Sequence, residues 1–420
     1  MRSDDNQRLR TAWTTRLQVC LCWLLIVGSG TIVSAQTVAY TNVTIESPNL
    51  SEAIANGTLV VQGDEIIDVG DEVQIPDDAR VVSLKGMTIM PGVVDPYFVF
   101  KRSQGATRTV VFQGRTITIP ARGGGGFTSG SFNWVGRYFV PHSFNFRPAM
   151  RSGITTGNLV ADGRGLSAFS SILGEPNDEM VFKKEGFLFA QLTNQTAAID
   201  IVRKPLEKDA KKPAASTGAA AARGRARTTA TAANDPTNEY WDAVRKGDSP
   251  VFVNVNNGAG VAHLLRLVKE HEKVRLVLVA TGPNLFQSLD DLKANPNVTV
   301  VLQPGIDQVP FKSDQMNVSR MLAEREIPFA ISMSLSNAQL QASQDDPFFP
   351  LAMLVRNGLD RQKTLKSVTI EPAKLLGIEK SHGSLEKGKK ANFLVFDGDP
   401  LETGSQLKQV ILDGKLTYEN

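Results

Sequence analysis

The feature that most constrains the fold is a β-rich pattern at both chain ends, with a different rhythm between them. Residues 36–90 alternate apolar and polar side chains in short runs separated by Asn-Gly, Gly-Asp and Pro-Asp turns, a pattern typical of antiparallel strands. Residues 375–420 repeat it, with strands expected at 393–396, 409–412 and 415–418. We therefore predict one small β-sandwich built from both ends of the chain.

The central region, residues 91–374, has short apolar runs followed by helical periodicity, which indicates βα units. Strands are expected at 94–99, 155–160, 187–192, 251–255, 276–280, 298–302 and 329–332, with a weaker eighth at 170–173. The clearest helices are expected at 261–272, 351–359 and 361–376. Eight such units close a barrel, so the predicted fold class is α/β, a (β/α)8 TIM-like barrel beside the β-sandwich.

Two stretches interrupt this rhythm. Residues 203–233 are rich in Ala, Lys and Arg and contain few large apolar side chains, which predicts a disordered basic insertion within the barrel. The alternative is a basic tether for an anionic surface. Residues 101–147 contain four consecutive glycines at 123–126 and an aromatic sequel, and we interpret them as a long loop over the barrel mouth.

The N-terminus resembles a targeting segment. Arg8, Arg10 and Arg16 precede an apolar stretch at 19–27, and small residues follow up to Ala35. A stretch of about nine apolar residues is far shorter than the roughly 20 needed to span a bilayer. We therefore predict a signal peptide at 1–35, export to the periplasm or the extracellular space, and no transmembrane segment in the mature chain.

Cysteine usage and charge exclude two classes of function. Both cysteines, Cys20 and Cys22, lie inside the predicted signal peptide, so the mature chain would have no thiol for catalysis or metal binding. With 46 Lys and Arg residues against 43 Asp and Glu residues, the net charge of +3 is too small to drive nucleic-acid binding by itself. We expect no nucleic-acid partner.

Three segments together resemble the metal-dependent amidohydrolase superfamily, and within it the branch around imidazolonepropionase. Residues 56–97, ending in KGMTIMPGVVDPY, are similar to the opening of the family, and residues 368–401, VTIEPAKLLGIEKSHGSLEKGKKANFLVFDGDPL, are similar to its close. Between them, RSGITTGNLVADGRG at 151–165 is similar to the second barrel strand of the family. The resemblance implies a barrel with its active site at the carboxyl ends of the strands, flanked by a β-sandwich made from both termini.

The resemblance also implies one or two divalent metals, usually zinc, that activate a water for attack on a non-peptide carbon–nitrogen bond. It places the first His-x-His pair at Tyr97 and Val99, the histidines of the fifth strand at Asn254 and Asn256, and the aspartate of the eighth strand near Ser334. None of these residues supplies an imidazole or a carboxylate, and a neutral amide is a poor zinc ligand. No metal ligand and no cofactor is therefore expected.

Few residues could rebuild a site. Asp95 survives from the opening motif, and among the 4 histidines only His142, in the long loop, could reach the barrel mouth. No residue is predicted to be catalytic. The weak candidates for lining a residual pocket are Asp95, Tyr97, Asn254, Asn256, Ser334 and His142.

These observations predict an exported protein of the amidohydrolase family that has lost its metal site and is catalytically inactive. Its partner would be a small polar ligand or a homologous amidohydrolase subunit, and we expect an oligomer. Two alternatives stay open. The chain could be an active amidohydrolase with an unconventional site, or a surface protein that binds polyanions through its basic insertion.

Overall fold

The computed structural model describes residues 36–99, 108–112, 115–119, 132–141, 145–161, 163–172, 178–192, 199–207, 237–282, 284–308, 315–335 and 346–420. The predicted signal peptide, His142 and residues 208–233 of the predicted insertion lie outside these ranges. Among the described residues, no helix is long and apolar enough to cross a membrane.

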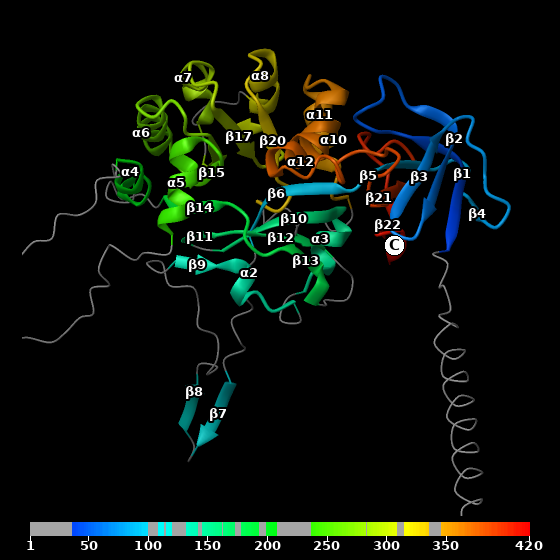
Figure 1. The fold of residues 1–420 in the computed structure, drawn as a ribbon, viewed down its shortest axis with the longest axis horizontal. Helices are drawn as coiled ribbons and strands as arrows, with labels where there is room; N and C mark the ends of the chain where they lie inside the picture. The colour runs from blue at the N-terminus through cyan, green and yellow to red at the C-terminus, as the bar shows by residue number, and fades with distance from the viewer. Residues whose placement is uncertain are drawn as a thin grey trace, which may run out of the picture.

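Both chain ends contribute to one sheet, drawn in blue and red in Figure 1. Its strands are β1 (Thr37–Ile45), β2 (Ile54–Gln62), β3 (Glu65–Gly70), β4 (Arg80–Ser83), β5 (Thr88–Pro91), β21 (Phe393–Phe396), β22 (Leu407–Leu412) and β23 (Lys415–Glu419). The order is β23-β22-β21-β5-β1-β2-β3, with β4 paired to β1. The two ends of the chain meet where β5 pairs antiparallel with β21, with Met90 opposite Leu394.

Seven parallel strands form most of the barrel wall. They are β6 (Val93–Val99), β10 (Ile154–Val160), β14 (Leu188–Leu192), β15 (Val251–Val255), β16 (Leu276–Ala280), β17 (Val298–Leu302) and β20 (Phe329–Ile331). From β14 to β20 the ladder runs without a register shift, whereas β6 and β10 pair with two shifts. The predicted fold class, an α/β barrel with a β domain built from both ends, is confirmed by this arrangement and by the structural neighbours reported below.

The eighth strand differs from the prediction. The segment expected to supply it, residues 170–173, lies partly in β12 (Ala168–Ser171), which pairs antiparallel with β10. The strand before it, β11 (Arg164–Leu166), pairs antiparallel with β14 and parallel with β9. The chain changes sheets at Ser167, and the short strands β13 (Val181–Lys183) and β9 (Phe132–Trp134) extend the two sheets from this point. Gly165 permits the close approach of β9, because a Cβ there would collide with the carbonyl oxygen of Asn133.

Helices cover the outer face of the regular part of the wall (Figure 1). The helices of at least five residues are α3 (Arg147–Arg151), α4 (Asp200–Glu207), α5 (Asn238–Lys246), α6 (Gly258–Lys269), α7 (Leu289–Lys293), α8 (Val318–Glu324), α10 (Phe349–Arg356), α11 (Arg361–Val368) and α12 (Ile370–Leu376). Apolar side chains of α4 to α8 pack with the outward residues of β14 to β17 in one core, while the inward residues belong to a second core. Side chains therefore fill the barrel interior.

The remaining short elements among the described residues are α2 (Val135–Tyr138), β7 (Arg108–Phe112), β8 (Arg115–Ile119), β18 (Asp307–Gln308), β19 (Gln315–Met316) and 3-10 turns at 178–180 and 285–288.

Two sequence predictions differ from the structure. The expected loop at 101–147 contains β7, β8, β9 and α2. Phe132 and Trp134 of β9 pack against the helix layer. The expected insertion starts too early, since residues 203–207 complete α4, where Val202 and Leu206 are buried.

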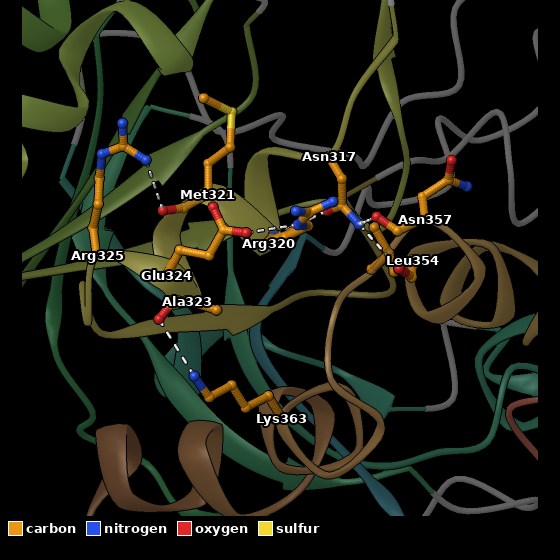
Figure 2. A network of polar contacts seen from close by, with 9 residues as sticks. All are labelled: Asn317, Arg320, Met321, Ala323, Glu324, Arg325, Leu354, Asn357 and Lys363. Carbon is orange, nitrogen blue, oxygen red and sulfur yellow. Dashed lines mark hydrogen bonds and ion pairs between the residues drawn. The ribbon is translucent and has the colours of Figure 1, made fainter.

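Polar side chains attach α8 to the helices that follow it, as Figure 2 shows. Asn317 caps the start of α8 by accepting the Arg320 amide at 3.0 Å, and its Nδ2 donates to the Leu354 carbonyl of α10 at 3.0 Å. At the other end, Lys363 Nζ of α11 donates to the Ala323 carbonyl at 3.3 Å. The end of the barrel is thus fixed to α10 and α11 by side chains that satisfy otherwise unpaired groups at both helix termini.

Candidate functional site

Asp95, Tyr97 and Ser334 meet in one buried cluster between β6 and the end of β20. Asp95 is 0% exposed, and Tyr97 and Ser334 are each 2% exposed. One Asp95 carboxylate oxygen, Oδ1, accepts the Tyr97 amide at 3.0 Å and the Ser332 hydroxyl at 2.7 Å, and Oδ2 accepts the Ser334 amide at 2.8 Å. Asp95 therefore links the first and the last parallel strands of the wall through its side chain.

The two serine hydroxyls complete this cluster. Ser334 Oγ donates to the Tyr97 carbonyl at 3.2 Å and lies 3.3 Å from Ser332 Oγ. Burial raises the pKa of Asp95, and the hydrogen bonds from Ser332, Tyr97 and Ser334 act in the opposite direction. The carboxylate is completely buried, and its three hydrogen bonds hold both oxygens against β6 and the end of β20.

Asn254 and Asn256 lie apart from this cluster, at the carboxyl end of β15. Asn254 is 6% exposed and its Oδ1 accepts the Thr281 hydroxyl at 3.0 Å, whereas Asn256 is exposed and its Oδ1 accepts Asn257 Nδ2 at 3.0 Å. The structure thus divides the described candidates into two groups. His142, the remaining candidate, lies outside the described residues.

Sequence reasoning missed Thr281 as a site residue. It follows β16 directly, as Asn256 follows β15, so position at a strand end was the signal that could have revealed it. Its backbone amide donates to the Val255 carbonyl at 3.0 Å, and the next residue, Gly282, packs so closely that a Cβ would collide with the Asn256 carbonyl. The loops after β15 and β16 therefore form one packed unit.

The metal chemistry implied by the sequence resemblance can be tested on these contacts. Amide ligands coordinate a cation through their oxygen, and the oxygens of Asn254 and Asn256 already accept hydrogen bonds. Within the described parts of the chain, no group of three or more His, Cys, Asp or Glu side chains is arranged to hold a metal ion. The described residues at the ligand positions do not fit a divalent metal.

Comparisons with known proteins agree with the fold. Residues 256–417 match the model of the amidohydrolase family. An imidazolonepropionase from Thermoplasma acidophilum is 32% identical over 78 residues, which is 18% of this chain and 18% of that protein. Residues 256–417, less than half of the chain, thus resemble the amidohydrolase family.

Solved amidohydrolase structures extend the likeness to nearly the whole chain. An amidohydrolase from Thermotoga maritima MSB8 superposes with a TM-score of 0.68 at 17% identity, over 91% of this chain and 100% of that one. An adenosine deaminase from Xanthomonas campestris, solved with bound zinc, has a TM-score of 0.50 at 14% identity, over 91% of this chain and 92% of that one. At these identities the likeness concerns the fold alone.

Proposed function

We propose that this amidohydrolase-family protein no longer performs metal-dependent hydrolysis and instead uses its barrel mouth to bind a small polar ligand. The observation that carries the proposal is the hydrogen bonding of the side-chain amides at the end of β15. Asn254 and Asn256 stand where the sequence resemblance places the metal-binding histidines of the family, and their oxygens are engaged by Thr281 and Asn257. Binding by hydrogen bonds is the chemistry that such groups can supply.

The cluster around Asp95 supports the same proposal. A hydrolytic site would need a carboxylate that can reach the attacking water, whereas Asp95 is 0% exposed and accepts hydrogen bonds from Tyr97, Ser332 and Ser334. Tyr97 and Val99 occupy the positions of the first histidine pair, and valine has no ligand atom. The residues of the mouth are thus suited to positioning a ligand rather than to activating water.

Metal content tests this proposal. The chain from residue 36 to 420 would be incubated with zinc, manganese and nickel, desalted exhaustively and analysed by mass spectrometry. We expect well below one tenth of a metal ion per chain. Near-stoichiometric metal that disappears in His142→Ala would overturn the proposal and favour an active amidohydrolase with an unconventional site.

We also propose that the mature chain begins at Gln36 after export and assembles with a homologous amidohydrolase subunit. The support is the sequence of residues 1–35 and the missing ligand set. N-terminal sequencing of the protein from culture medium or periplasm should begin at Gln36. Co-purification from its natural host should recover a catalytically complete homologue, and a single monodisperse species of this chain alone would count against the assembly.

A further inference from the structure

A groove beside α8 lies apart from the two groups of candidate residues described above. It has a volume of about 350 Å³ and is bounded by α8, by the two-stranded ribbon of β18 and β19, and by the end of α10. Pockets for small molecules typically measure about 300–1,000 Å³. None of the described residues that line the groove stands at a metal-ligand position implied by the sequence resemblance. The groove is therefore a separate candidate for a binding site.

Three half-buried apolar side chains form one part of this groove, namely Ile306, Met316 and Met321. Ile306 also packs against the inner core of the barrel and Met321 against the outer one, so the fold fixes both side chains. Methionine is unbranched and polarizable, which lets it adapt to ligands of different shape. This part of the groove favours an aliphatic chain, because contact with these side chains removes the chain from water.

Arg320 supplies a positioned positive charge on the wall of the same groove. Its Nε donates to Glu324 Oε1 at 2.7 Å, as Figure 2 shows, and its guanidinium packs on Gly358, where a Cβ would lie only 2.9 Å from Nη1. Nη1 and Nη2 of Arg320 donate to no described residue. Two adjacent guanidinium nitrogens with free N–H groups match the two oxygens of a carboxylate.

Glu324 limits this attraction, since its carboxylate also lines the groove. The side chains of Arg320 and Glu324 are 51% and 52% exposed, so water weakens the interaction between them, and Glu324 occupies only one of the N–H groups of the guanidinium. We therefore expect Glu324 to orient Arg320 and also to weaken the binding of an anion. A second carboxylate, Asp307, lies opposite Met316 in the ribbon, so the test has to compare an anion with a cation.

We propose that the groove binds a small carboxylate that carries an aliphatic chain. The carboxylate accepts hydrogen bonds from Nη1 and Nη2 of Arg320, and the chain lies on Ile306, Met316 and Met321. The inference goes beyond the proposed function, because it assigns a second ligand to a site that contains neither Asn254 nor any other candidate residue of the barrel mouth.

The test is a titration of the chain 36–420 with sodium hexanoate, followed by NMR of methionines labelled with 13C in their methyl groups. Met316→Leu and Met321→Leu identify the two resonances of the groove and keep its apolar character. We expect both resonances to shift saturably, with a dissociation constant of about 1 mM or lower. Acetate, which lacks the chain, and hexanamide, which lacks the charge, should each bind at least about tenfold more weakly.

Variants connect the shift to the proposed charge. Arg320→Gln removes the guanidinium and should weaken hexanoate binding by about tenfold or more. Glu324→Gln keeps an acceptor for Nε and removes the opposing charge, so it should strengthen binding by about threefold. Arg266→Gln, on α6, removes a positive charge elsewhere and should bind like the parent chain. All three positions are exposed, so these variants should fold.

Hexylammonium, which has a similar chain and the opposite charge, shows which charge the groove prefers. Tighter binding of hexylammonium than of hexanoate would overturn the proposal and assign the groove to a cation. Methionine resonances that do not move, that shift without saturation, or that respond equally in Arg320→Gln and Arg266→Gln would also overturn it. Metal content does not enter this test, so its failure and the failure of the proposed function are distinguishable.

Discussion

Two places in the barrel correspond, by the sequence resemblance, to positions where the amidohydrolase family holds its metal. One is the buried cluster of Asp95, Tyr97 and Ser334 between β6 and the end of β20, which we call the seam, and the other is the end of β15. The polar groups of the two places differ in their hydrogen bonding. At the seam, Asp95 accepts three hydrogen bonds and is completely buried. At the end of β15, the oxygens of Asn254 and Asn256 accept hydrogen bonds, while their amide nitrogens have no hydrogen-bond partner among the described residues. A polar residue at a strand end can thus stabilise the barrel or remain available to a ligand, and its hydrogen-bond partners decide which.

The largest effect should come from removing the carboxylate of the seam. Asp95→Ala would leave the Tyr97 amide, the Ser332 hydroxyl and the Ser334 amide without their acceptor in a buried place. We expect the free energy of unfolding in urea to fall by about 3–5 kcal/mol. The exposed Asp68→Ala should change it by less than about 0.5 kcal/mol, and a loss below about 1 kcal/mol in Asp95→Ala would show that the seam does not depend on this residue.

Lowering the pH should reduce the free energy of unfolding, whereas the side-chain amides at the end of β15 carry no titratable group and should not contribute. Burial and the nearby Lys389 and Lys390 lower the pKa of His382 from 6.5 to about 4. The unfolded chain therefore takes up a proton on this histidine below about pH 6.5, while the folded chain does so only near pH 4. Stability should fall through this window by about 3 kcal/mol.

The seam should act in the opposite direction during the same titration. The raised pKa of Asp95 means that the folded chain is stabilised as pH falls through that pKa. Urea unfolding at a series of pH values should show a shallower acid decline in His382→Gln than in the parent chain, and a steeper one in Asp95→Asn. Identical profiles in all three proteins would contradict both assignments.

A smaller effect is expected where the loops after β15 and β16 touch. Gly282→Ala would place a methyl group against the Asn256 carbonyl, and we expect the free energy of unfolding to fall by about 2 kcal/mol. Gly258→Ala, at the start of α6 in open space, is the matched control and should not reduce stability. Equal melting temperatures for the two variants would show that the close approach is easily relieved.

The smallest effect on stability should come from Asn254 itself. Asn254→Ala removes the acceptor of the Thr281 hydroxyl, but that hydroxyl also lies 3.4 Å from the Val255 carbonyl and can donate there. The expected loss is about 0.5–1 kcal/mol, several times less than for Asp95→Ala. A loss as large as that of Asp95→Ala would mean that Asn254 belongs to a closed network and is not available to a ligand.

Much of the fold follows from local pattern. Strands at 251–255, 276–280 and 298–302 agree with β15, β16 and β17 residue for residue, because each is a short apolar run buried on both faces. The helix expected at 361–376 is two helices that meet at Thr369. Pro372 explains the break, since it has no amide hydrogen for the Val368 carbonyl and its ring clashes with that carbonyl in a continuous helix.

The parts that could not be predicted depend on contacts between distant segments. The expected eighth strand lies partly in β12, which is antiparallel to β10, and Gly165 just before it packs closely on Asn133 of β9; no local pattern reveals either contact. Likewise, the sequence shows Asp95 and the asparagines at the expected positions, but the Ser332 and Thr281 hydroxyls that donate to Asp95 and Asn254 come from other strand ends. The sequence therefore predicted which residues stand at the candidate site, but it could not predict which hydrogen bonds they make.

The pairing of β5 with β21 also has a consequence for biosynthesis. Met90 leaves the ribosome long before its partner Leu394, so during most of translation the nascent chain presents β5 as an unpaired strand edge. Pairing β5 with β21 closes a loop that contains the entire barrel, and the entropy cost of closing so long a loop is high. This cost falls once the folded barrel has brought the two segments near each other. The β domain should therefore be the last part of the nascent chain to mature, and a product truncated before Phe393 should be a preferred target for chaperones and proteases.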